Sequence, residues 1–205
     1  VTPVTPVTPV TPVTPVTPVT PGPPVVAVGS GLTVTASADQ PAATLAPESA
    51  ARVPFVKTIL TASADGDVTV GSVTVERKGL ADDSAFDALI LLDEDGTQIG
   101  NSKTLNSDHK VIFNTAFTVK AGTSKVVTVS GNMVADNSTR AGQVARLAVV
   151  GVNAGSSAVN ASFPLESNGM TINSTLDIGT VTMTIGSLDP GAANTKTVGT
   201  KGYYT

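Results

Sequence analysis

The sequence predicts an all-β protein, a two-sheet β-sandwich preceded by an extended polyproline II segment. Short runs rich in valine and threonine are separated by turn-forming residues about every ten positions, as is typical of all-β domains. No stretch of helical length shows a hydrophobic period near 3.6 residues. The 205 residues include five phenylalanines and no tryptophan, so aliphatic side chains must supply most of the core.

The first 24 residues are predicted to be a stalk or linker. Seven copies of Val-Thr-Pro end at Pro21, and Gly22-Pro23-Pro24 follows them. A proline at every third position excludes a helix or a central strand and favours polyproline II, in which 21 residues span roughly 65 Å. A linker between domains is one interpretation, and packing of the valine edge against a neighbouring subunit is another.

Glycosylation is a further interpretation of the repeat, because stalks rich in threonine and proline carry O-linked sugars. The candidate acceptors are Thr2, Thr5, Thr8, Thr11, Thr14, Thr17 and Thr20. Three Asn-x-Ser/Thr triplets begin at Asn137, Asn160 and Asn173. Of these, Asn137 is expected to be the best exposed, since it lies between charged residues.

Residues 25–174 are predicted to form the sandwich. Asp65-Gly66-Asp67 and Glu94-Asp95-Gly96-Thr97 are predicted turns, and residues 36–50 a loop marked by proline. Residues 84–92 and 138–147 have some helical character but are short. The segments with strand character are 32–35, 55–61, 68–75, 88–92, 110–119, 124–130, 144–152 and 158–163.

Residues 175–205 resemble the first strands of a second copy of the same domain. Thr33 matches Thr182 at an offset of 149 residues, and at this offset Thr35, Pro41 and Ala43 also meet identical residues. Two interpretations stay open: a tandem repeat that is truncated here, or strands donated to a neighbouring subunit. The candidate assembly residues are Val181, Met183, Ile185, Tyr203 and Tyr204.

Composition excludes several functional classes. The net charge is −4 with 12 Lys and Arg, so binding to nucleic acid is not expected. The chain has no cysteine, which excludes disulfides and thiol chemistry, and no apolar run long enough for a transmembrane helix. A catalytic triad would depend on His109, which we interpret as a solvated loop residue. The chain is therefore expected not to be an enzyme.

Calcium is the one cofactor that the sequence suggests. Carboxylates cluster at residues 82–87 and 93–95, and Asp93 and Asp95 precede a glycine as in a calcium-binding loop. The loop lacks the glutamate that an EF-hand has at its twelfth position. Because Asp-Gly also favours hairpin turns, we interpret these residues as a turn in preference to a calcium site.

Four segments carry a resemblance to a known family: Pro54 to Lys57, Gly66 to Val75, Ala88 to Asp93 and Phe117 to Thr123. They resemble the tandem Ig-like modules of prokaryotic surface-layer and stalk proteins, similar to those of candidate-phylum bacteria. The resemblance covers about residues 30–174 and brings no catalytic residues. It implies an Ig-like sandwich, an extracellular location at the cell surface, self-assembly, and binding of calcium or glycans.

These observations predict a structural cell-surface protein that assembles with copies of itself into a filament or a surface layer. Cell-envelope glycans are the other expected partner. The alternatives are a stalked adhesin and an accessory module of a larger secreted hydrolase. An adhesin would present aromatic or charged residues on one set of loops, whereas the aromatic residues here lie mostly within predicted strands.

Overall fold

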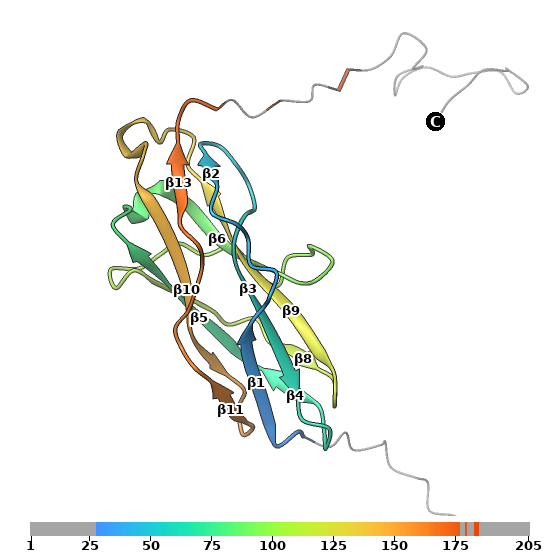
Figure 1. Ribbon diagram of the computed structural model, residues 1–205. Coiled ribbons are helices and arrows are strands. Elements are labelled where there is room, and N and C mark those ends of the chain that lie inside the picture. Colours follow the sequence, from blue (N-terminus) through green and yellow to red (C-terminus); the bar gives the residue numbers. More distant parts are fainter. Residues whose placement is uncertain (1–27, 177–178, 180–182, 185–205) are drawn as a thin grey trace, which may run out of the picture.

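The computed structural model describes residues 28–176, 179 and 183–184, which form two packed β-sheets, a small two-stranded sheet and almost no helix (Figure 1). The predicted all-β sandwich is confirmed at this level. The helical character expected in two segments is limited to the 3₁₀ turns η1 (Asp83–Ala85) and η2 (Ser138–Arg140). The predicted polyproline stalk lies outside the described residues.

One layer is a five-stranded sheet in the order β11-β1-β3-β9-β6. Its neighbours are antiparallel, except that β1 runs parallel to β11. The strands are β1 (Gly31–Ala36), β3 (Val53–Ala62), β6 (Phe86–Leu92), β9 (Ser124–Met133) and β11 (Ala158–Ala161).

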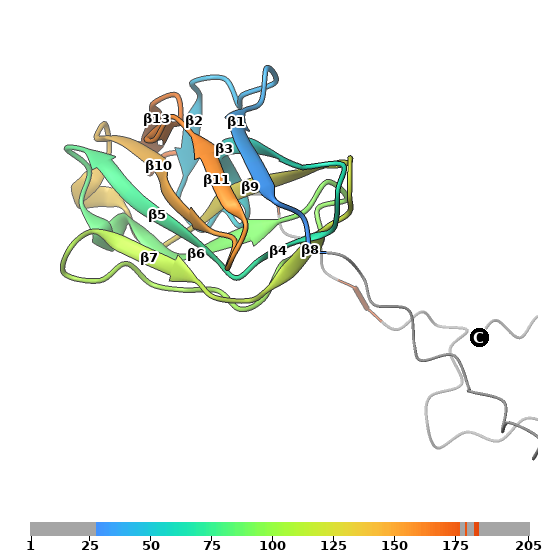
Figure 2. The same ribbon diagram turned by 90° about the horizontal axis from the view of Figure 1, so that it is seen from below.

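The other layer is a six-stranded sheet in the order β2-β13-β10-β5-β7, with β12 also paired to β10. Here β2 and β13 are the parallel pair. The strands are β2 (Leu45–Pro47), β5 (Ser72–Gly79), β7 (Lys110–Phe113), β10 (Val144–Asn153), β12 (Leu165–Glu166) and β13 (Met170–Asn173); β4 (Val68–Val70) and β8 (Phe117–Val119) make the small sheet. Figure 2 shows β1, β3 and β9 on one side of the molecule and β5, β7 and β10 on the other.

The core lies between the two layers and follows the alternation of the strands. In β1, Leu32 and Val34 are buried and Thr33 and Thr35 face outward. A shift of register in β3 turns two successive residues, Phe55 and Val56, into the core. The Phe55 ring lies 5.5 Å from that of Phe86. A Cβ at Gly131 would come within 2.9 Å of Phe86 ring atoms, so only glycine fits beneath this pair.

Two predicted strands are each divided in the structure. Segment 68–75 divides at Gly71, whose N–H donates to Asn153 O at 2.8 Å as the chain passes from the small sheet to the six-stranded sheet. Segment 110–119 likewise divides into β7 and β8. The predicted loop 36–50 contains β2, which is held by its pairing with β13.

The two ends of the sandwich lie at opposite poles. β1 starts at the pole that is lowest in Figure 1, and β13 ends at the highest pole. The two strands belong to different sheets. The chain therefore enters the sandwich at one end of its long axis and leaves it at the other.

Candidate functional site

The proposed repeat of the first strand can be compared with the burial of β1. The two buried residues of β1, Leu32 and Val34, fall on the apolar residues Val181 and Met183 at the offset of 149, and outward Thr33 and Thr35 fall on Thr182 and Thr184. The sequence of the repeat thus keeps the alternation of apolar residues and threonine seen in β1, as well as two identities.

The corresponding residues Val34 of β1 and Met183 of the repeat differ in exposure. Val34 is 2% exposed, whereas Met183 is 90% exposed. Met183 is the predicted assembly residue that the structure describes; Val181, Ile185, Tyr203 and Tyr204 lie outside the described residues. The place of β1 between β11 and β3 is filled by residues 31–36 of the chain itself. The sandwich therefore needs no donated strand at that position.

The edges of the large sheets limit where another strand could pair. Residues 97–103 cover the β6 edge through bridges from Leu89 to Lys103 and from Leu92 to Gln98. On the β7 edge, the N–H of Lys110 donates to Asn106 Oδ1 and its carbonyl accepts from the N–H of Asn106, both at 2.9 Å. β2 ends in a proline, and β11 has four residues. Short, covered and proline-containing edges disfavour uncontrolled pairing with other chains.

The candidate calcium residues Asp93 and Asp95 form a turn. Asp93 Oδ1 accepts hydrogen bonds from the N–H groups of Asp95 (3.2 Å) and Thr97 (2.8 Å). The N–H of Asp93 donates to Thr97 O at 2.9 Å, and Gly96 has φ of 76°. In the part of the chain that the structure describes, no three or more acidic or histidine side chains are grouped to hold a metal ion.

The other Asp-Gly turn, residues 65–67, contacts distant parts of the chain. Both carboxylate oxygens of Asp65 accept from the N–H of Ser30, at 3.2 and 3.1 Å. Hydrogen bonds from Ser63 and Ser30 lower the pKa of Asp65 to about 2. Asp67 accepts from Lys120 Nζ at 2.7 Å and from the N–H of Ala121 at 2.9 Å, and these bonds lower its pKa.

A cluster of Arg77, Asp83 and His109 was not predicted. The Asp83 carboxylate binds Arg77 Nε and lies 2.6 Å from His109 Nδ1. Burial raises the pKa of Asp83, but the hydrogen bonds from His109 and Arg77 outweigh it, so the net shift is downward. His109 is about half exposed, and in the described chain its ring contacts no hydroxyl. The cluster links η1 to the loop before β7. Periodicity gives no signal for it, because His109 is 26 positions from Asp83 and the three residues lie in different segments.

The expectation that Asn137 is exposed is wrong. Its side chain is fully buried, Nδ2 donates to Ala85 O at 3.3 Å, and its N–H donates to Glu48 Oε2 at 3.0 Å. Its charged neighbours in sequence predicted exposure. Asn137 lies at the start of η2, however, and its side chain points into the protein. Because N-glycosylation needs a free Nδ2, the folded chain does not present Asn137 as an acceptor. The threonine acceptors at 2–20 lie outside the described residues.

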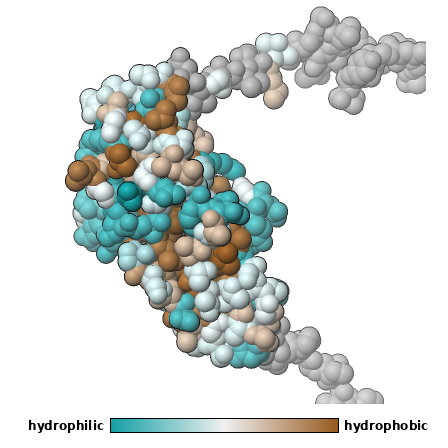
Figure 3. All heavy atoms as spheres, in the orientation of Figure 1, coloured by the Kyte–Doolittle hydropathy of each residue, from teal (hydrophilic) through white to brown (hydrophobic). Residues whose placement is uncertain are grey.

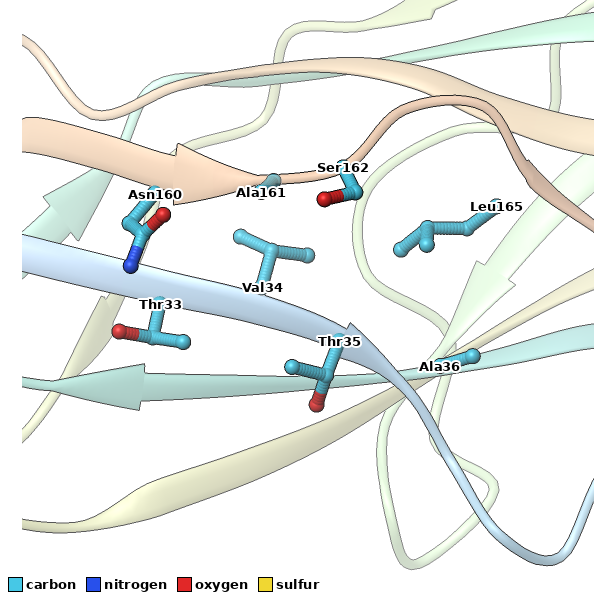
Figure 4. A pocket seen from close by; sticks show the side chains of 8 residues that line it. All are labelled: Thr33, Val34, Thr35, Ala36, Asn160, Ala161, Ser162 and Leu165. Atoms are coloured by element: carbon cyan, nitrogen blue, oxygen red, sulfur yellow. The ribbon is translucent and has the colours of Figure 1, made fainter.

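Two hollows mark the described surface. The larger, about 760 Å³, lies where β5 ends and β10 begins and is lined by Leu80, Gln143, Val144 and Arg146 among others. Leu80 is 95% exposed there, and hydrophobic side chains protrude near these strand ends in Figure 3. The smaller, about 280 Å³, opens where β11 separates from β1; Val34 points toward Ala161 across it, and Thr33 and Thr35 point away (Figure 4).

The chain was compared with known proteins. No protein-family model matches the chain, and no curated protein matches it. Among the described residues no helix has the length and apolarity to cross a membrane.

Proposed function

We propose that this chain is a structural subunit of an extracellular filament or surface layer, with an Ig-like sandwich as its folded unit. The observation that carries the proposal is the placement of the two ends: the chain enters at one pole and leaves at the other. Subunits with opposed ends can be joined in line without folding the chain back on itself. Expected partners are further copies of the chain and cell-envelope glycans.

The repeat of the β1 pattern supports linear assembly. In the sequence it begins six residues after β13 ends. We expect a strand that follows β13 in sequence either to open a second sandwich of the same chain or to pair with a neighbouring copy. Both arrangements place sandwiches end to end.

Met183 provides the apolar contact in this proposal. Its side chain is large, apolar and 90% exposed, so covering it with a partner surface lowers the free energy. At the sequence offset of 149 Met183 corresponds to Val34, which is buried in the core. Burial of Met183 therefore favours contact with a further sandwich, either in the same chain or in a neighbouring copy.

The test is electron microscopy and sedimentation of the full chain with two matched variants. Met183→Asp is expected to abolish arrays or fibres, because a charge replaces the apolar contact. Leu80→Asp places the same charge on another fully exposed hydrophobic site and is expected to leave assembly intact. Wild-type protein that stays monomeric at every concentration tested would overturn the proposal.

A stalked adhesin is a second candidate, favoured by the hollow beside Leu80. Its apolar floor and the adjacent Arg146 could receive an amphipathic or anionic glycan. In that case the wild type is monomeric, binds purified cell-envelope glycan, and loses the binding in Leu80→Asp. Absence of such binding would exclude this candidate.

A further inference from the structure

Both terminal strands of the sandwich are paired on two sides. β1 lies between β3 and β11, and β13 lies between β10 and β2. In each trio the outer neighbour, β11 or β2, is parallel to the terminal strand. A terminal strand at a sheet edge would be held by one ladder only, so this arrangement doubles the main-chain anchorage at each end.

The direction of these strands decides how they respond to tension. Tension between the two poles acts along β1 at its first residue and along β13 at its last residue (Figure 1). Interstrand hydrogen bonds lie across the strands. The bonds of each ladder are therefore sheared together, instead of opening one after another from an end. The fully buried side chains of β1 and β13 belong to one hydrophobic core between the two sheets.

The point where the chain enters β1 is further anchored by a cluster of hydrogen bonds. Asp65 and Asp67 belong to the turn described above, and Ser157 follows β10. The bonds are Gly29 N to Asp67 O (2.7 Å), Ser30 N to the Asp65 carboxylate, Gly31 N to Ser63 Oγ (3.1 Å) and Ser157 Oγ to Gly29 O (2.5 Å). We call these bonds the base clamp. Ser157 is 6% exposed, so its bond is shielded from water.

The point where the chain leaves β13 has a smaller equivalent. The N–H of Glu48 donates to Asn173 O at 2.8 Å, which ties the end of β13 to the residue after β2. Asn173 Oδ1 accepts from the N–H groups of Thr175 (3.1 Å) and Leu176 (2.8 Å). The last described turn of the chain is thus fixed to the sandwich.

We propose that the sandwich is a tension-bearing unit, in which β1 with its base clamp and β13 hold the fold against pulling along the long axis. The inference deepens the proposed structural role by naming the mechanical task of the subunit. It needs no self-assembly for its test, because a single chain can be pulled.

The test is the lifetime of single full-length chains at constant force in optical tweezers. The chain has no cysteine, so handles attached at Val28→Cys and Leu176→Cys, both exposed, apply force at the two poles. Ser157→Ala removes a base-clamp bond and is expected to shorten the lifetime about fivefold, the factor for a hydrogen bond broken in the transition state. Ser167→Ala is the matched control: Ser167 too is buried and bonds a main-chain atom, Leu147 N at 3.0 Å, but it precedes β13, on the side away from Leu176, where the force enters.

Ser167→Ala is expected to change the lifetime less than twofold while lowering the melting temperature about as much as Ser157→Ala. Equal lifetimes under force in the two variants would overturn the proposal. If Ser157→Ala does not fold, the turn residues Asp65 and Asp93 make the same comparison: Asp65→Ala should shorten the lifetime and Asp93→Ala should not. Monomeric wild type in microscopy would overturn the proposed function and leave this result standing.

Discussion

The two Asp-Gly turns, at residues 65–67 and 93–97, have similar sequences and different positions in the fold. Asp65 and Asp67 accept hydrogen bonds from residues 30, 120 and 121, which are distant in sequence. The carboxylate of Asp93 accepts hydrogen bonds from residues two and four positions ahead. The first turn fixes the start of β1 to the sandwich, whereas the carboxylate of the second closes its own loop.

The comparison shows what a local signal can predict. Asp-Gly favours a tight turn through backbone conformation and short-range hydrogen bonds, and both turns form as predicted. Which turn becomes an anchor depends on what the rest of the chain brings beside it. Substitutions at each turn separate the two roles. We make four predictions, in decreasing order of expected effect.

The largest difference is expected from glycine replacements. Gly29 precedes β1 and packs against the first turn, where a Cβ would lie 2.4 Å from Gly66 O and 2.7 Å from Val68 Cγ2. Gly29→Ala should therefore cost about 3 kcal/mol of the free energy of unfolding. At the second turn nothing lies within 4 Å of a Cβ on Gly96, and only its φ of +76° opposes a side chain. Gly96→Ala should cost about 1 kcal/mol. Urea unfolding measures both, and equal costs would contradict the distinction between the turns.

The second expected effect is on acid stability. The pKa of Asp65 is lowered from 3.8 to about 2 in the folded chain, so its ionised form stabilises the fold. That stabilisation is complete above pH 4 to 5 and is lost as the pH falls toward 2. Asp65→Asn should lower the melting temperature at pH 7 and make its fall between pH 4 and 2 less steep. If the melting temperature of the variant falls as steeply between pH 4 and 2 as that of the wild type, groups other than Asp65 cause the loss of stability in acid.

A smaller effect is expected from the ion pairs beside the turns. Lys120 contacts Asp67 at 2.7 Å, and Lys125 contacts Glu94 at 3.1 Å. Each pair has one solvent-exposed and one partly buried side chain. Ion pairs that are open to solvent contribute little and are screened by salt. Lys120→Ala and Lys125→Ala should each shift the melting temperature slightly, and 0.5 M salt should reduce the difference from the wild type. A large loss for Lys120→Ala that persists in salt would mean that its alkyl chain, and not its charge, supports the first turn.

Strand alternation predicted most of the fold because it depends on neighbours in sequence: β1, β3, β6, β9 and β10 lie where valine and threonine alternate or apolar residues run together. It missed β2, because a three-residue strand in a loop exists only through its pairing with β13. It missed the division at Gly71, which depends on a hydrogen bond to Asn153, 82 positions further along.

The candidate site was less predictable for the same reason. Asn137 has polar neighbours in sequence, yet its own side chain is packed against residues from other segments. The Arg77–Asp83–His109 cluster joins three segments whose residue types carry no shared pattern. By contrast, the inward and outward positions of β1 itself follow from the sequence, since they need only the two-residue period of a strand.

The smallest expected effect is that of calcium on the second turn. Calcium takes six to eight oxygen ligands, but Asp93 Oδ1 is already the acceptor of two N–H groups. A bound ion would have to compete with these bonds, and the described residues offer no group of three carboxylates at the turn. Millimolar calcium or a chelator should therefore leave the melting temperature unchanged. If calcium instead raises the melting temperature of the wild type but not that of Asp95→Asn, this turn is a calcium-binding loop. The two turns would then be similar in sequence and different in function.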